Sequence, residues 1–96
     1  MAYDPGAIDA TLAAAVGDEP GLIAELRMAF VESAERALTA LGAATTDDDW
    51  SRATLRLKGL AASFGAVRLM TLAIDAERTP RDAATLAKLK RAIARL

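Results

Sequence analysis

The chain has 96 residues, 12 of them basic and 13 acidic, so its formal net charge is −1. A chain with so little net charge shows no overall sign of binding nucleic acid or an anionic membrane. Its 53% apolar and 26% charged residues are ordinary for one folded domain covering 1–96 and argue against disorder. With neither cysteine nor histidine, it has no disulfide, no thiolate and no imidazole for acid–base work or metal binding.

The first predicted helix begins at Asp4-Pro5, an N-cap followed by a proline in the first turn, and ends at Gly17. Its apolar stripe is Ile8, Leu12, Ala15 and Val16. A second, longer helix, which Asp18 can cap, ends at Gly42, a glycine suited to the left-handed position after a helix. Its inward stripe is Leu22, Ile23, Leu26, Ala29, Phe30, Ala37 and Leu41.

The linker 43–49 ends in three aspartates, and a third helix runs from about Asp48 to Phe64 before it stops at Gly65. Acidic side chains favour the positive end of a helix dipole, whereas three adjacent aspartates project in different directions. Helix capping is therefore the preferred interpretation of Asp47, Asp48 and Asp49, and we expect no metal site there.

A fourth helix is predicted from about Val67 to Arg78. The segment Thr79-Pro80-Arg81-Asp82 resembles a capping box with proline at the first helical position, which opens a last helix. Inward residues of that helix are Leu86, Leu89 and Ile93. Its basic residues, which we interpret as a solvated face, are Lys88, Lys90, Arg91 and Arg95.

Alternating period-two patterns of strands are absent from the sequence. Short connections between amphipathic helices favour antiparallel neighbours. We therefore expect an all-α fold, an antiparallel up-down four-helix bundle with an additional short N-terminal helix across one end or flank.

The third predicted helix has a core face centred on Leu57, and Leu55 lies about 160° away from it, pointing to solvent. The core stripe is Trp50, Ala53, Thr54, Leu57, Leu60, Ala61 and Phe64. Companions of Leu55 on the outer face are Asp48, Ser51, Arg52, Gly59, Ala62 and Ala66, and Lys58 lies on the flank.

An outward glycine inside a helix needs an explanation, because Gly59 costs roughly 1 kcal/mol relative to alanine. Close helix crossing would explain a glycine that faces the core; an outward one indicates access to the backbone from outside. A single exposed leucine is unremarkable. Beside small residues, however, Leu55 completes a low apolar patch of the kind that marks partner surfaces. The patch is Leu55, Gly59, Ala62 and Ala66, and its basic margin is Arg52, Arg56 and Lys58.

Residues 55–66 read LRLKGLAASFGA. This segment resembles the phosphorylation motif of histidine-containing phosphotransfer (HPt) domains, which belong to bacterial two-component phosphorelays. That motif is His-x-Leu-Lys-Gly, followed by small residues and then by Gly-Ala. The resemblance covers nearly the whole chain, including the acidic linker with Trp50 and the segment AVRLMTLAIDAE. In that family an exposed histidine accepts a phosphoryl group from an aspartate of a receiver domain. A lysine three residues later assists electrostatically, and a glycine four residues later leaves room for the receiver. The matching positions are Leu55, Lys58 and Gly59.

A polar residue of the following helix often approaches the histidine in the family, and its match is Glu77. In an antiparallel pair that turns near Gly65, residue 77 comes level with residues 53–55. It shares the bundle-facing stripe of Met70, Ala73 and Ile74. A partly buried carboxylate needs a partner, which Lys58 or Arg52 could supply. A surface glutamate at a fraying helix end is the alternative interpretation.

Position 55, which holds the phosphorylated histidine in the family, is leucine in this chain. Phosphoryl transfer of this kind needs an imidazole nitrogen as nucleophile, which leucine lacks. The hydroxyls of Ser51, Thr54 and Ser63 could not form the reversible N–P linkage. We therefore expect no enzymatic activity, no catalytic residue and no cofactor.

The resemblance implies a pseudo-phosphotransfer domain that docks a receiver domain or a sensor histidine kinase without carrying phosphate. Expected partner-binding residues are Arg52, Leu55, Arg56, Lys58, Gly59, Ala62 and Glu77. One alternative is an active histidine phosphotransferase whose histidine has been replaced; another is a structural bundle that associates with itself through the same patch. We expect a cytoplasmic monomer without nucleic acid or membrane, because no apolar run reaches roughly 20 residues and the start lacks the blocks of a signal peptide.

Overall fold

The computed structural model describes residues 5–17 and 19–96, and all of its regular secondary structure there is helical. The helices are α1 (Pro5–Val16), α2 (Pro20–Ala43), α3 (Asp47–Ser63), α4 (Val67–Glu77) and α5 (Ala83–Ala94). These bounds agree with the predicted all-α fold. In the part of the chain that is described, no helix is long and apolar enough to cross a membrane.

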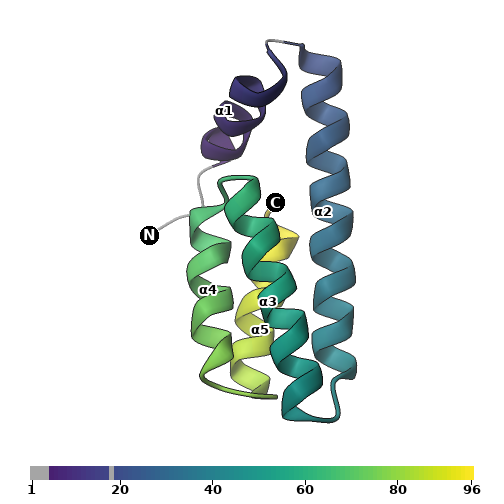
Figure 1. Ribbon diagram of the computed structural model, residues 1–96, viewed down its shortest axis with the longest axis vertical. Helices are drawn as coiled ribbons and strands as arrows, with labels where there is room; N and C mark the ends of the chain where they lie inside the picture. Colours follow the sequence, from purple (N-terminus) through teal and green to yellow (C-terminus); the bar gives the residue numbers. More distant parts are fainter. Residues whose placement is uncertain (1–4, 18) are drawn as a thin grey trace.

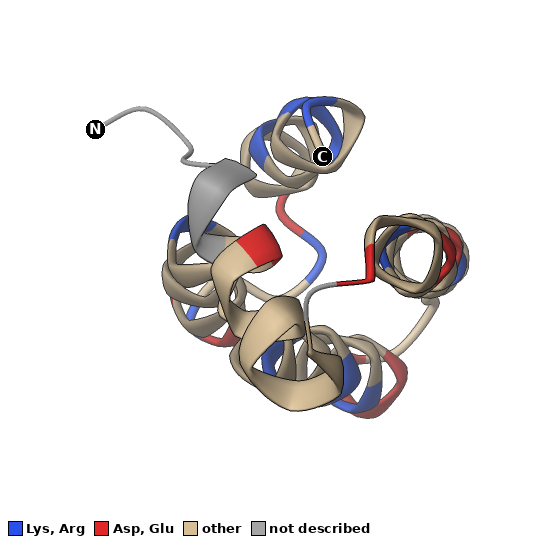
Figure 2. Cartoon of the chain, turned by 90° about the horizontal axis from the view of Figure 1, so that it is seen from above, with Lys and Arg blue, Asp and Glu red and all other residues tan. Residues whose placement is uncertain are grey.

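The helices pack as a bundle in which α3 contacts α2 and α4, and α5 also contacts α2 and α4. Helix α1 packs on α2 at one end of the bundle (Figure 1). Seen from above, charged residues of both signs recur on several helices (Figure 2). Helix α3 therefore has a neighbour on each flank and an outer face between them.

The core is built from one apolar stripe of each helix, with α3 contributing Trp50, Leu57 and several small residues. The rings of Phe30 on α2 and Phe64 after α3 stack with centroids 4.8 Å apart. Many core residues are alanines, whose short side chains let the helix backbones approach closely. The buried alanines are Ala34, Ala37, Ala53, Ala61, Ala66, Ala73 and Ala76.

Trp50 joins α3 to α4 inside the core. Its side chain is 1% exposed, and its indole Nε1–H donates a 2.7 Å hydrogen bond to the main-chain carbonyl of Ala76. A buried indole N–H usually finds such a partner because leaving it unpaired is costly. This bond ties the first turn of α3 to the last turn of α4.

Arg27 on α2 joins both ends of the described chain. Its Nε and Nη2 donate to Asp9 Oδ1 on α1 at 3.1 and 2.6 Å, and its Nη1 donates to the carbonyl of Leu96 at 2.9 Å. One guanidinium thus connects α1, α2 and Leu96, two residues after the end of α5.

The predicted helix ends at Gly17 and Gly65 are confirmed, and α2 ends one residue after the predicted Gly42, but the left-handed conformation predicted for Gly42 is wrong. Gly17 and Gly65 have positive φ angles of 80° and 69°, where glycine is favoured because it has no Cβ. Gly42 instead lies within α2, which continues to Ala43 and ends through Ala44 with φ −63°. The predicted caps Asp4 and Asp18 lie outside the described residues.

The start of α3 agrees with the sequence, whereas the start of α5 does not. Thr46 Oγ1 accepts a 3.0 Å bond from Asp49 N, and the three aspartates occupy the first turn of α3. The predicted capping box at 79–82 is wrong, because Arg81 has φ 58° and interrupts any helix beginning at Pro80. Asp82 caps α5 by accepting a 2.8 Å bond from Thr85 N. That bond and a second from the Thr85 hydroxyl hold the pKa of Asp82 below its usual 3.8.

Several predicted inward residues are exposed, and one predicted outward residue is buried. The buried apolar stripe of each of these helices is narrower than helical periodicity alone predicts, so residues at its edge are exposed. They are Ala15, Leu22, Ala29 and Ile74. Ala66 is 1% exposed, which contradicts its predicted place on the outer face of α3. The chain has left the helix by then: Gly65 N–H donates to Ala62 O at 3.3 Å and Ala66 N–H to Ala61 O at 2.9 Å. This pair of bonds is a Schellman motif, which turns Ala66 into the core.

Trp50→Phe should lower the free energy of unfolding by about 2–3 kcal/mol, because it removes a buried hydrogen bond and part of a well-packed side chain. Urea denaturation followed by far-ultraviolet circular dichroism measures the change. Leu55→Ala, at an exposed position of the same helix, is the control and should stay within about 0.5 kcal/mol. Equal effects of the two substitutions would contradict the role given to the Trp50–Ala76 bond.

Candidate functional site

The outer face of α3 is low and partly apolar. Leu55 is 55% exposed, whereas Leu57, two residues later, is fully buried. Gly59 and Ala62 follow Leu55 at intervals of four and seven residues and are also exposed. The predicted orientations of these residues are confirmed. We call Leu55, Gly59 and Ala62 the α3 patch, which no longer includes the buried Ala66.

Gly59 has no structural reason to be glycine. A Cβ atom built at this position meets no atom within 4 Å, and the φ angle is not positive. Neither close helix crossing nor an unusual backbone conformation therefore requires it. Its carbonyl accepts a 2.9 Å bond from the Ser63 hydroxyl, as many helical carbonyls do. The missing side chain leaves the backbone of α3 open from outside, beside Leu55.

The flank of α3 that faces α4 carries an ion pair. Lys58 Nζ lies 2.8 Å from Glu77 Oε1, and both side chains are about one-third exposed, at 34% and 33%. Of the two cations proposed to pair with Glu77, Lys58 does so, and Glu77 is also an exposed residue at the C-terminal end of α4, as the alternative interpretation had it. Arg52 is bound instead to Asp48, at 3.0 Å and one turn earlier on α3.

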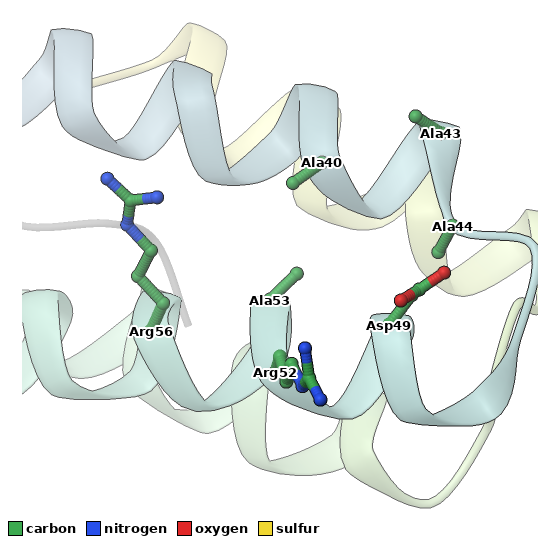
Figure 3. Close-up of a pocket in the computed structure, with 7 residues that line it drawn as sticks. All are labelled: Ala40, Ala43, Ala44, Asp49, Arg52, Ala53 and Arg56. Carbon is green, nitrogen blue, oxygen red and sulfur yellow. The ribbon is translucent and has the colours of Figure 1, made fainter.

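The flank of α3 that faces α2 carries an open groove of about 300 Å³ (Figure 3). We call it the α2–α3 groove, and it is lined by Ala40, Ala43, Ala44, Asp49, Arg52, Ala53 and Arg56. Arg56 reaches toward α2 at one end, and Asp49 points toward Ala44 at the other. Sequence reasoning placed Arg52 and Arg56 at a partner surface but missed the groove and Asp49.

The seven predicted partner-binding residues thus lie around the exposed side of one helix. The α3 patch occupies the middle, Lys58 and Glu77 border it toward α4, and Arg52 and Arg56 border it toward α2. Only the α3 wall of the groove left a signal in the sequence: Asp49 and Arg56 are seven residues apart and share a helical stripe. Its other wall comes from α2, which periodicity within α3 cannot reveal.

Two of the three hydroxyl groups near Leu55, those of Thr54 and Ser63, donate to main-chain carbonyls. Thr54 is buried and donates to Ser51 O at 2.9 Å, and Ser63 donates to Gly59 O at 2.9 Å. Within 5–17 and 19–96, no group of acidic side chains is arranged to hold a metal ion.

Gly59→Ala should raise the free energy of unfolding by about 0.5–1 kcal/mol, because alanine fits the open space and favours the helix. Chemical denaturation measures the change. Gly65→Ala is the matched control and should destabilise the protein, because residue 65 has φ 69°. A loss of stability in Gly59→Ala would show that the glycine serves the fold.

Leu55→Glu should alter the free energy of unfolding by no more than about 0.5 kcal/mol, as is usual for exposed sites. Leu57→Glu should unfold the domain, because it places a carboxylate in the core. Thermal melts of the two variants make the comparison. If both variants unfold, Leu55 belongs to the core and the α3 patch does not exist.

Comparison of the chain with protein-family models, curated proteins and solved structures found no match in any of the three. Function is therefore inferred from the residues themselves and from their geometry on α3.

Proposed function

We propose that the chain is an HPt-like domain without a phosphoacceptor, which docks a receiver domain of a response regulator or a sensor histidine kinase of a cytoplasmic phosphorelay. The observation that carries this proposal is Gly59, an exposed glycine beside an exposed leucine, with no role in packing or backbone geometry. A partner that approaches the α3 backbone closely would explain why alanine does not occupy that position.

The scaffold proposed for this function is the antiparallel up-down four-helix bundle of HPt domains, with α1 as the additional helix. Support comes from the contacts of α2 through α5, each of which packs against two of the other three. Support also comes from the short connections between α2 and α3 and between α3 and α4. In such a bundle α3 presents its outer face to a partner.

Docking would use the three parts of the surface differently. The α3 patch would contact an amphipathic helix of the receiver through Leu55. The basic rim of Arg52 and Arg56 would face the acidic phosphorylation pocket of the receiver, where complementary charge favours correct encounter. Lys58 is neutralised by Glu77 and would contribute mainly shape. A bound domain would block or redirect phosphoryl flow, because Leu55 offers no nitrogen to accept the group.

The proposal predicts binding without phosphorylation. A panel of purified receiver domains, titrated calorimetrically, should include at least one that binds the chain. Leu55→Glu and Gly59→Arg should each weaken that affinity by more than about 1 kcal/mol, because a charge or a long side chain is placed in the interface. Lys90→Glu, at an exposed position of α5, which does not contact α3, is the control and should bind normally.

The same receivers, phosphorylated, should leave the chain without acid-labile phosphate. Labelling of the unchanged chain would refute the absence of phosphotransfer, and a panel without any binder would refute docking. Leu55→His tests the alternative of an active phosphotransferase whose histidine has been replaced: efficient transfer to that variant would favour the alternative.

A further inference from the structure

The α2–α3 groove carries two charges that no other described residue neutralises. Within residues 5–17 and 19–96, the Asp49 carboxylate and the Arg56 guanidinium take part in no ion pair or side-chain hydrogen bond. The third charged lining residue, Arg52, is already paired with Asp48. The groove therefore has an unpaired anion at one end and an unpaired cation at the other, with alanines between them (Figure 3).

The two unpaired charges are arranged so that the groove is complementary to itself. Asp49 and Arg56 are seven residues apart on α3, which places them about 10 Å apart along the helix and about 20° apart around it. Residues 52 and 53 lie midway between them. Rotating a second α3 by 180° about an axis through this midpoint brings each Asp49 opposite the Arg56 of the other copy. Both charges of both copies are then paired.

We propose that the α2–α3 groove is a self-association site, in which a second copy of this chain packs its α3 antiparallel across the groove about a twofold axis near Ala53. A twofold contact of this kind is isologous, so one patch serves both sides. The inference does not depend on receiver docking: the docking proposal also uses Arg56, but self-association is argued only from the pairing of Asp49 with the Arg56 of a second copy.

The groove walls allow the necessary close approach. Ala40 and Ala43 on α2, Ala44 directly after it and Ala53 on α3 end at Cβ, so these parts of the wall do not hold a second helix away. A second copy is the favoured occupant because it brings both required charges in the required order. Exposed ion pairs are weak and screened by salt, so the dimer forms at high protein concentration and low ionic strength. Dilute protein stays monomeric, as the sequence predicts.

Charge reversal tests the proposal with the chain itself as the probe. Sedimentation equilibrium of the unchanged chain at low salt should show a concentration-dependent shift from monomer to dimer mass, which added salt reverses. Asp49→Arg and Arg56→Asp should each weaken association by about tenfold or more, because each places like charges opposite one another twice. Circular dichroism should show that both variants stay helical.

Mixing the two variants supplies the decisive measurement. One variant then carries two cations in the groove and the other two anions, so the mixture should form a heterodimer although neither variant associates alone. The double variant D49R/R56D should dimerise by itself, because it exchanges the two charges. Lys90→Asp, on α5, is the matched control and should dimerise like the unchanged chain.

Three results would overturn the proposal. The unchanged chain could stay monomeric at every soluble concentration in low salt, which would leave the groove to a different protein. It could associate while both single variants associate equally well, which would place the contact elsewhere. Dimerisation abolished by Leu55→Glu but not by charge reversal would assign self-association to the α3 patch. Receiver binding in the earlier titrations is unaffected by any of these results, so the two proposals fail separately.

Discussion

The buried hydrogen bond from Trp50 to Ala76 is the constraint on which the arrangement of α3 against α4 depends. In a helix that continued past α4, the carbonyl of Ala76 would accept a hydrogen bond from the amide of residue 80. Residue 80 is proline, which has no amide hydrogen to donate. The indole supplies a donor there, alongside Thr79 N–H at 3.2 Å. Fixing the end of α4 against the start of α3 sets the register of the pair. That register brings Glu77 within reach of Lys58 and leaves Leu55 facing outward.

Helix α3 divides its residues between two tasks that impose opposite demands. Its inner face is filled by Trp50 and Leu57 and by alanines that permit close packing. Its outer face holds an apolar leucine in water and a glycine that weakens the helix, neither of which benefits the isolated domain. These two features, which cost stability without an internal gain, are the observations on which the docking proposal rests. The Lys58–Glu77 pair beside them keeps this face almost neutral at its centre, so charge is concentrated at the groove.

Helical periodicity was sufficient to predict which residues of α3 face the core and which face outward. A regular helix rotates by a fixed angle per residue, so the side chains of Leu55 and Leu57 must point to different sides. Periodicity failed at Ala66, since the same rotation was continued past Gly65, where the Schellman turn changes the direction of the chain. The predicted capping box at 79–82 was wrong, and Asp82 is the cap instead, because a capping pattern does not reveal the left-handed conformation of Arg81. The Lys58–Glu77 pair could be anticipated from the antiparallel geometry of two adjacent helices. The groove could not, since its walls come from separate helices.

The contacts of Arg27 imply that the bundle does not open uniformly. Helix α1 packs only on α2 among the described helices, so its attachment depends on that contact and on the burial of Ile8 and Leu12 in the core. Arg27 bonds to Asp9 and to the carbonyl of Leu96, and loss of its guanidinium would release α1 and the end of α5 together. These segments would form a local unfolding unit with faster amide exchange than α3 and α4, which the Trp50 bond holds. Motion at this end of the molecule can therefore occur while the outer face of α3 keeps its shape.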